Sequence, residues 1–296
     1  MPYLPELGVG ELAPVSSPLK WAGGKGQLLA QMQAHFPPAF ARYHEPFLGG
    51  GAVFFYLVPQ RGCRAFISDL NPELMNFYAV LRNETDAFLR AVRQLAEAYQ
   101  QSSPEERKSM YYLWRNADRA EDFSAWPALK RAVRFYFLNK TAYNGLYRTN
   151  QRGYFNVPWG RYKRPSLYRP DVLKSAAEVL RRFIEWMGAA SFTIVLEHVQ
   201  AGDFVYLDPP YVPLSPTSSF TSYTREGFGA EEQAALAAVC RELDRRNVMF
   251  LLSNSAVEEV KRLYRGFRQV EVQARRNINS KGDKRGPIPE LLVRNY

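Results

Sequence analysis

The tetrapeptide Asp208-Pro209-Pro210-Tyr211 combines residue types that suit the binding of a planar amine. Asp208 follows the apolar run 204–207, and a carboxylate at the carboxyl end of a parallel strand lies where α/β sheets bind ligands. Two successive prolines cannot continue a strand ladder, so the carbonyl of Pro209 is free to accept a hydrogen bond beside the carboxylate. Tyr211 offers a flat face on which a purine can stack.

These groups meet the chemical need of the exocyclic amine of adenine. That amine is a poor nucleophile because its lone pair is delocalised into the ring. Two acceptors that hold its hydrogens favour the tetrahedral geometry in which the lone pair can attack. The same residues could instead form an ordinary turn with a surface tyrosine. Their position directly after a Phe-Val-Tyr-Leu strand favours the functional interpretation.

A glycine-rich turn and a downstream acid form a second candidate site. The segment Glu45–Gly51 (EPFLGGG) follows a predicted strand, and glycines at a strand-to-helix turn let the backbone approach a ligand closely. Asp69 ends the next predicted strand, where an acid is well placed to hold ribose hydroxyls. Three glycines alone would be an ordinary tight loop. Together with Asp69 they indicate a nucleoside ligand.

The segment Lys20–Gly26 (KWAGGKG) contains a Gly-Lys pair but is not a nucleotide P-loop. A P-loop requires Ser or Thr directly after its lysine, whereas Gly26 follows Lys25. This excludes an NTPase of that type. Lys25 could instead meet a ligand carboxylate, and Trp21 could wall a pocket. The alternative is a surface lysine and a core tryptophan.

The segment from Tyr143 to Arg169 is basic and aromatic and contains no Asp or Glu. Its basic residues are Arg148, Arg152, Arg161, Lys163, Arg164 and Arg169, and its aromatic residues are Tyr143, Tyr147, Tyr154, Phe155, Trp159, Tyr162 and Tyr168. Such a mixture suits a surface that holds phosphates and wedges between bases. A solvated basic loop is the alternative, but so many aromatic residues are rarely left exposed without a partner. A second basic patch runs from Arg275 to Arg285.

Three stretches of different character must position these residues. From about 19 to 71, short apolar runs (43–47 and 64–70) alternate with glycine-rich turns and helix-like segments. From 72 to 170, apolar residues at three- and four-residue spacing predict helices over 73–81, 87–98 and 129–138, and Ser103-Pro104-Glu105-Glu106 has the form of a helix start. An irregular hairpin is predicted after Lys140.

The last stretch returns to βα alternation. Strands are predicted over 204–207 and 248–252, with a helix over 230–245 between them, and late antiparallel strands over 267–272 and 291–293. Alternation of strands and helices indicates a parallel sheet. The order therefore predicts one α/β domain with a helical insert.

Composition sets broader limits. The 296 residues carry a net charge of +10, which favours polyanionic partners. The cysteines and histidines (Cys63, Cys240, His35, His44 and His198) are scattered along the chain, so we expect no metal site and exclude a zinc deaminase. No apolar run is long enough to span a bilayer, and the first residues lack an export pattern. We therefore expect a cytoplasmic protein without a membrane partner.

Together these motifs resemble the Dam family of DNA adenine methyltransferases, in the α group of amino-methyltransferases. The likeness covers nearly the whole chain, and its motifs are KWAGGK (20–25), EPFLGGG (45–51), YNGL (143–146), FNVPWGRY (155–162) and DPPYVPL (208–214). The resemblance implies an α/β fold: a Rossmann-like methyltransferase sheet with an inserted helical-bundle plus β-hairpin DNA-recognition domain. Residues 1–72 and 171–296 would form the discontinuous catalytic domain, and residues 73–170 the target-recognition domain.

The resemblance also implies a cofactor and a reaction. S-adenosyl-L-methionine would be bound by Trp21, Lys25, Phe47, Gly49, Gly51, Asp69 and Asp208. Asp208, Pro209, Pro210 and Tyr211 would form the catalytic pocket for an adenine flipped out of the duplex, because the amine cannot be reached inside the base stack. Transfer would be direct, without a metal. The enzyme class would be site-specific DNA-methyltransferase (adenine-specific).

The resemblance further implies how double-stranded DNA is read. Arg148 would read a guanine in the major groove, Leu146 and Pro158 would touch a thymine methyl, and Lys20 with Tyr162 would contact the outer base pair. Tyr143 and Asn144 would fill the gap left by flipping. The matching positions favour GATC as the site, and Tyr147 and Thr149 lie where family members vary. We expect a monomer associated with the nucleoid.

Rival interpretations remain at this stage. Methylation of a cytosine N4 amine or of a protein glutamine amide needs similar acceptors, but the glutamine enzymes place Asn before the prolines, where this chain has Asp208. A catalytically silent DNA-binding module of the same fold is the second rival. Its expected mark is a broken DPPY or glycine turn, and both are intact here.

Overall fold

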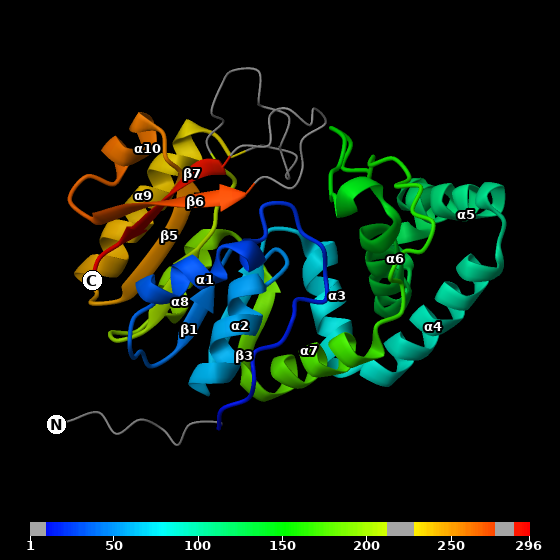
Figure 1. Ribbon diagram of the computed structural model, residues 1–296, viewed down its shortest axis with the longest axis horizontal. Helices are drawn as coiled ribbons and strands as arrows, with labels where there is room; N and C mark the ends of the chain where they lie inside the picture. The colour runs from blue at the N-terminus through cyan, green and yellow to red at the C-terminus, as the bar shows by residue number, and fades with distance from the viewer. Residues whose placement is uncertain (1–9, 212–227, 276–286) are drawn as a thin grey trace.

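The computed structural model describes residues 10–211, 228–275 and 287–296 (Figure 1). Within these ranges the strands form one seven-stranded sheet in the order β3-β2-β1-β4-β5-β7-β6. The strands are β1 (Tyr43–Glu45), β2 (Ala65–Asp69), β3 (Ile184–Ala189), β4 (Phe204–Leu207), β5 (Met249–Ser255), β6 (Arg268–Arg275) and β7 (Pro287–Arg294). Most of the basic patch predicted over 275–285 lies outside the described residues.

The sheet is parallel from β3 to β5 and ends in an antiparallel pair. β1, β2, β3, β4 and β5 pair in parallel, while β7 runs antiparallel to β5 and to β6. The strand order reverses between β1 and β4, and ligands of open α/β sheets bind at such a switch point, outside the carboxyl ends of the strands. The late antiparallel strands expected from the sequence are present, and β7 is longer than predicted.

The period-two alternation of β4 divides its residues between two cores. Phe204 and Tyr206 belong to one buried hydrophobic cluster, and Val205 and Leu207 to the other. α2 (Ala52–Arg61), α3 (Pro72–Asn83) and α7 (Pro170–Phe183) supply the first cluster, whereas α8 (Val195–His198), α9 (Ala230–Arg245) and α10 (Glu258–Leu263) supply the second. The sheet is thus covered on both faces, as parallel sheets require.

The helical stretch forms a layer beside the sheet (Figure 1). It contains α4 (Thr85–Gln101), α5 (Pro104–Asn116) and α6 (Ala128–Thr141). Ser103 begins α5 with a complete capping box, in which its hydroxyl and the Glu106 carboxylate each accept a backbone N–H. α3 lies at the junction, because it packs against α6 as well as against α7.

The segment after α6 is an irregular hairpin. Its antiparallel pairing consists of isolated bridges, Ala142 with Trp159 and Thr149 with Phe155. Asn144 and Arg161 have positive φ, and proline at 158 has no N–H to donate, so a regular ladder cannot form. A Tyr111 hydroxyl donates to the Val157 carbonyl at 2.8 Å and ties the hairpin to α5.

The remaining short elements are α1 (Leu29–Met32) and 3-10 turns over Lys25–Gln27, Gln33–His35, Ala117–Arg119, Glu121–Ala125, Tyr143–Gly145 and Phe192–Ile194. Among the helices described, none has the length and apolar character needed to cross a bilayer.

Candidate active site

A buried ion pair forms the centre of the candidate site. The Nζ of Lys25 lies 2.8 Å from Oδ1 of Asp208, which directly follows β4, and the two side chains are 3% and 19% exposed. Lys25 also donates to the carbonyl of Gly23 at 2.7 Å. The Asp208 carboxylate and the Gly23 carbonyl therefore fix the ammonium. Lys25 and Asp208 lie far apart in the sequence.

Tyr211 lies against this ion pair. The Lys25 ammonium is 4.8 Å from the centroid of the Tyr211 ring, a distance at which a cation is attracted to the ring face. The Tyr211 hydroxyl donates to Oε2 of Glu290, on β7, at 2.8 Å. Two contacts thus position the ring: the Lys25 ammonium lies over its face, and the Glu290 carboxylate accepts from its hydroxyl.

The two prolines between these residues differ in their hydrogen bonding. Gln233 of α9 donates to the carbonyl of Pro210 at 3.1 Å, and Asn254 of β5 donates to Gln233 at 3.0 Å. Among the described residues, nothing donates to the carbonyl of Pro209. The role predicted for this carbonyl, as an acceptor of an amine hydrogen, stays a prediction.

The pKa of the Asp208 carboxyl lies above that of an ordinary aspartate. Burial raises its pKa to about 6, even though Lys25 acts in the opposite direction. The nearby charge of Glu290 also raises it. Burial likewise raises the pKa of the Glu45 carboxyl, at the end of β1, well above its usual range, with Asp208 and Asp69 adding to the effect. Perturbed carboxyls of this kind gather at functional sites.

The glycine turn and Asp69 meet at the ends of β1 and β2. The Oδ2 of Asp69 accepts the Gly49 N–H at 2.9 Å, and Oδ1 accepts the Asn71 N–H at 3.0 Å. Gly49 has φ +48 and Gly51 has φ +66, a backbone region that glycine enters without strain. The Leu70 N–H also acts on this carboxylate, so backbone donors fix its orientation.

Trp21 packs directly on this turn. A Cβ atom added at Gly49 would lie 2.6 Å from the Trp21 indole nitrogen, so only glycine permits this approach. On its other side the indole stacks with Tyr147 at 6.1 Å and with Phe135 of α6 at 6.5 Å between centroids. The tryptophan therefore joins the glycine turn to the helical stretch.

Phe47 lies in an aromatic cluster beside the turn. Its ring stacks on Phe192 at 5.4 Å and meets Phe228 edge-on at 5.8 Å. Phe192 follows β3, and Phe228 precedes α9. Aromatic faces of this kind suit the adenine ring of a nucleoside.

The residues predicted to contact DNA fall on the hairpin and on the loop before the 3-10 turn over Lys25–Gln27. Tyr143, Arg148, Pro158 and Lys20 are exposed. The Lys20 ammonium lies 4.8 Å from the centroid of the half-buried Tyr162 ring, so these two predicted partners are adjacent.

Two further members of that set have local roles in the hairpin. Leu146 is half-buried and packs against the cluster that contains Phe155 and Val157. Asn144 has φ +55 in the turn that follows α6. Arg148 donates to the Asn156 side chain at 2.8 Å, across the hairpin.

Sequence reasoning missed Glu290, Gln233 and Phe192. Each acts on a predicted site residue from a strand or helix distant in the sequence, so no local pattern marks it. Glu45 lay inside the EPFLGGG motif and was read only as part of the turn. No sequence pattern singles Glu45 out; only the structure shows that it is buried, at 3% exposure.

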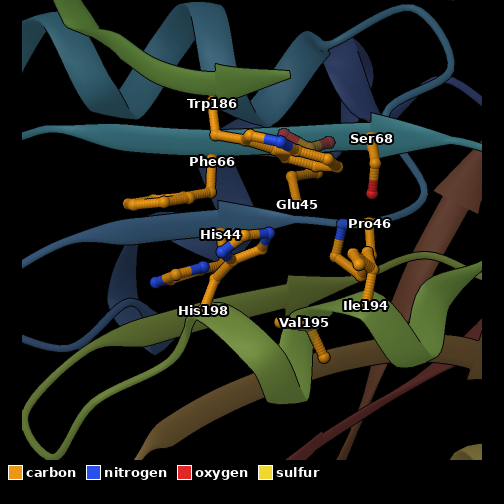
Figure 2. Close-up of a pocket in the computed structure, with 9 residues that line it drawn as sticks. All are labelled: His44, Glu45, Pro46, Phe66, Ser68, Trp186, Ile194, Val195 and His198. Atoms are coloured by element: carbon orange, nitrogen blue, oxygen red, sulfur yellow. The ribbon is translucent and has the colours of Figure 1, made fainter. Parts of the chain in front are cut away.

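A small cavity lies on the sheet face covered by α8, against the end of β1 (Figure 2). It is lined by His44, Phe66, Trp186, Val195 and His198, among others, and has a volume of about 10 Å³, which is room for about one water. It is too small for a nucleoside. No cluster of metal-ligating side chains occurs in the part of the chain that is described.

Comparison with known proteins identifies the family. Residues 21–278 match the family described as D12 class N6 adenine-specific DNA methyltransferases. The chain belongs to this family. Membership of this family implies an S-adenosylmethionine donor and a DNA substrate.

Several relatives are similar to the chain over almost its whole length. It is 44% identical over 286 residues to the Type II methyltransferase M.MjaIII of Methanocaldococcus jannaschii, across 94% of this chain and 98% of that protein. It is 38% identical over 280 residues to a DNA adenine methylase of Vibrio cholerae, across 93% and 94%. It is 34% identical over 276 residues to the DNA adenine methylase of Escherichia coli K12, across 93% of each. The predicted membership of the Dam family is confirmed.

Proposed function

We propose that this D12 methyltransferase is a site-specific DNA-methyltransferase that methylates adenine N6 within GATC in double-stranded DNA, and that Asp208 is its central catalytic residue. The observation that carries this is the Lys25–Asp208–Tyr211 arrangement after β4, beside the Gly49 turn. We propose that residues 1–72 and 171–296 form the catalytic part and residues 73–170 the recognition part. We also propose that the enzyme acts as a nucleoid-associated monomer in the cytoplasm.

The residues present fit S-adenosylmethionine by their chemistry. Asp69 would hold the ribose hydroxyls, and the Phe47 cluster would take the adenine ring. Lys25 would attract the carboxylate at the methionine end, and Trp21 with Gly49 and Gly51 would wall the site. When bound, the cofactor supplies an electrophilic methyl group on a sulfonium. Because glycine alone tolerates the contact with Trp21, the turn lets this indole pack directly against its backbone.

The chain's own groups prepare the target amine. Asp208 has Oδ1 on Lys25; its other oxygen would accept one amine hydrogen, and the Pro209 carbonyl would accept the other. Such paired acceptors favour the pyramidal amine over the planar one. Asp208 is the stronger acceptor when it is ionised, and its pKa of about 6 leaves it ionised at neutral pH. The face of Tyr211 would stack on the flipped base.

Recognition of GATC is proposed from the hairpin. Arg148 is exposed and its guanidinium would bond a guanine edge, the commonest specific contact in the major groove. Leu146 and Pro158 offer apolar surface for a thymine methyl. Lys20 and Tyr162, which lie together, would read the outer base pair. Tyr143 and Asn144 would fill the vacated stack.

The decisive experiment is expression in cells that lack DNA methylation, followed by sequencing of modified bases. N6-methyladenine confined to GATC supports the proposal. Modified cytosine, another site or unmodified DNA would contradict it, and each of these outcomes is read directly from the same data.

Asp208→Ala tests the proposed catalytic role. Removing a positioned acceptor of this kind costs about 10²–10³ in kcat, and binding to the duplex should remain within about threefold because Asp208 lies outside the hairpin. Single-turnover methyl transfer and duplex binding are measured side by side. A variant that still turns over near the wild-type rate would rule out the role.

A further inference from the structure

The side chain of Asn139, in the last turn of α6, pairs with both main-chain groups of Lys20. Its Oδ1 accepts the Lys20 N–H at 3.0 Å, and its Nδ2 donates to the Lys20 carbonyl at 2.6 Å. Asn139 is only 4% exposed. A two-point contact of this kind fixes the position and the orientation of one residue's backbone, and a buried amide that is fully paired is held rigidly.

Neighbouring contacts strengthen the same junction. Lys140 donates to the carbonyl of Pro18 at 2.7 Å, and Gly145 lies so close that a Cβ added there would be 2.7 Å from the Lys20 Cβ. Gly145 also has φ +65, so the position favours glycine on both counts. The end of α6 and the turn after it therefore enclose residues 18–20.

Those residues lead straight into the cofactor site. Lys20 extends over Tyr162 on the hairpin. The next residue, Trp21, packs between the glycine turn and Tyr147, and Lys25 pairs with Asp208. One short segment, residues 20–25, thus contacts the DNA-reading hairpin at one end and the catalytic carboxylate at the other.

We propose that Asn139 is a positioning residue that couples sequence recognition to cofactor binding, by holding the main chain of Lys20 between the hairpin and the Trp21–Lys25 segment. The proposal rests on the proposed function, since it assigns Lys20 to DNA and Lys25 to the cofactor. Asn139 itself touches neither ligand. When DNA engages Lys20, the rigid pair transmits its position to Trp21. Without that pair the two ends of the segment adjust independently.

Such coupling is reciprocal and measurable. If the target duplex tightens cofactor binding by a factor α, the cofactor must tighten duplex binding by the same α, and typical couplings are about 5–150-fold. We expect α of at least about fivefold in the wild-type enzyme and below about twofold once the Asn139 pair is removed. Discrimination between the target and a duplex changed at its outer base pair should fall together with α.

The experiment uses the full chain, S-adenosylmethionine and duplexes that carry the site found by sequencing. Dissociation constants are measured by calorimetry for each ligand in the presence and absence of the other. Asn139→Ala removes both hydrogen bonds, and Asn139→Asp keeps the acceptor for the Lys20 N–H and loses the donor, so it preserves more of the local packing if the alanine variant fails to fold. Thermal melting of each variant checks that it is folded.

Two matched controls separate coupling from general stability. Thr141→Val removes a buried hydrogen bond on the same helix, from the Thr141 hydroxyl to the Phe137 carbonyl at 2.6 Å. Asn76→Ala removes another asparagine-to-backbone bond at the opposite end of α6, to the Ala128 carbonyl at 3.0 Å. Both controls should keep α within about twofold of the wild-type value, because neither contacts Lys20.

The outcomes distinguish this proposal from the function on which it rests. A wild-type protein that methylates no DNA refutes the proposed function. An active wild type with α near one overturns the role of Asn139, as does a folded Asn139 variant with α unchanged. Equal losses of α in the control variants would also overturn it, since a structural effect would then explain all four.

Discussion

Replacing Lys25 by methionine should move the acid limb of the pH–rate profile to higher pH. Asp208 has a pKa of about 6 because burial raises it, and Lys25 is the largest opposing influence. The ammonium is 2.8 Å from Oδ1, and both side chains are largely buried, so solvent screens the pair weakly. An opposite charge at this range lowers a carboxyl pKa by about 1–3 units, which corresponds to roughly 1.4–4 kcal/mol.

The Lys25→Met variant should therefore titrate at a pH of roughly 7–9. The ionised carboxylate is the stronger acceptor of amine hydrogens, so activity should fall as the pH falls through the pKa of Asp208. At pH 7 about 90% of the wild-type carboxyl is ionised, whereas between roughly half and one hundredth remains ionised in the variant.

The assay measures initial rates from pH 5 to 10 with both S-adenosylmethionine and duplex far below saturation. Under these conditions the rate reports ionisations of the free enzyme. Weaker cofactor binding lowers the rate at every pH, whereas only a changed Asp208 pKa moves the acid limb of the pH–rate profile along the pH axis. Lys25→Arg keeps the positive charge and serves as the control. An acid limb at the wild-type pH in Lys25→Met would refute the electrostatic account of this pair.

Three other perturbations test separate parts of the structure. Arg148→Ala should cost about 1–3 kcal/mol in binding to the target and relax the preference for one base of the site. Arg152→Ala, also on the exposed hairpin, should weaken binding to all duplexes equally. Competition between duplexes that differ at single base pairs measures both effects. Glu290→Gln keeps an acceptor for the tyrosine hydroxyl but removes a charge that raises the catalytic carboxyl pKa, so its acid limb should shift to lower pH, opposite to the lysine variant. Asp118→Ala leaves Arg134, 3% exposed, without its carboxylate and should destabilise folding by about 3–5 kcal/mol, as urea unfolding would show; an unchanged midpoint contradicts this.

The secondary structure was predictable where apolar runs are bounded by strong turn signals. The strand over 204–207 and the helix over 230–245 have the predicted limits, because Asp208-Pro209 ends the first and Gly229 precedes the second. β1 is shorter than its apolar run, since Pro46 cannot donate to the ladder. β3 went unrecognised as an individual strand because, beyond its first residue, it is half-exposed or exposed and lacks a continuous apolar pattern.

The candidate site was predictable only as a set of residue types. Asp208, Asp69 and the glycines carry local signals, since each follows a strand or forms a turn. Glu290 and Asn139 carry none. Their partners lie 79 and 119 positions away, and a lone acid in a strand or an amide in a helix is compatible with many surroundings. Only the packing of β7 on β5 and of α6 on the Lys20 loop brings them into contact.

Strand register explains why two acids so distant in sequence lie at the same edge of the sheet. His44 of β1 pairs with Phe66 of β2 on one side and with Val205 of β4 on the other. Asp69 lies three residues beyond Phe66 (69 − 66 = 3), and Asp208 lies three beyond Val205 (208 − 205 = 3). The two carboxylates therefore stand at the same height on either side of β1, separated by two strand spacings, or roughly 10 Å. The glycine turn that continues β1 lies between them. A one-residue slip in either pairing would turn one acid to the opposite face of the sheet, so the register of β1 determines whether the two acids can act on one extended ligand.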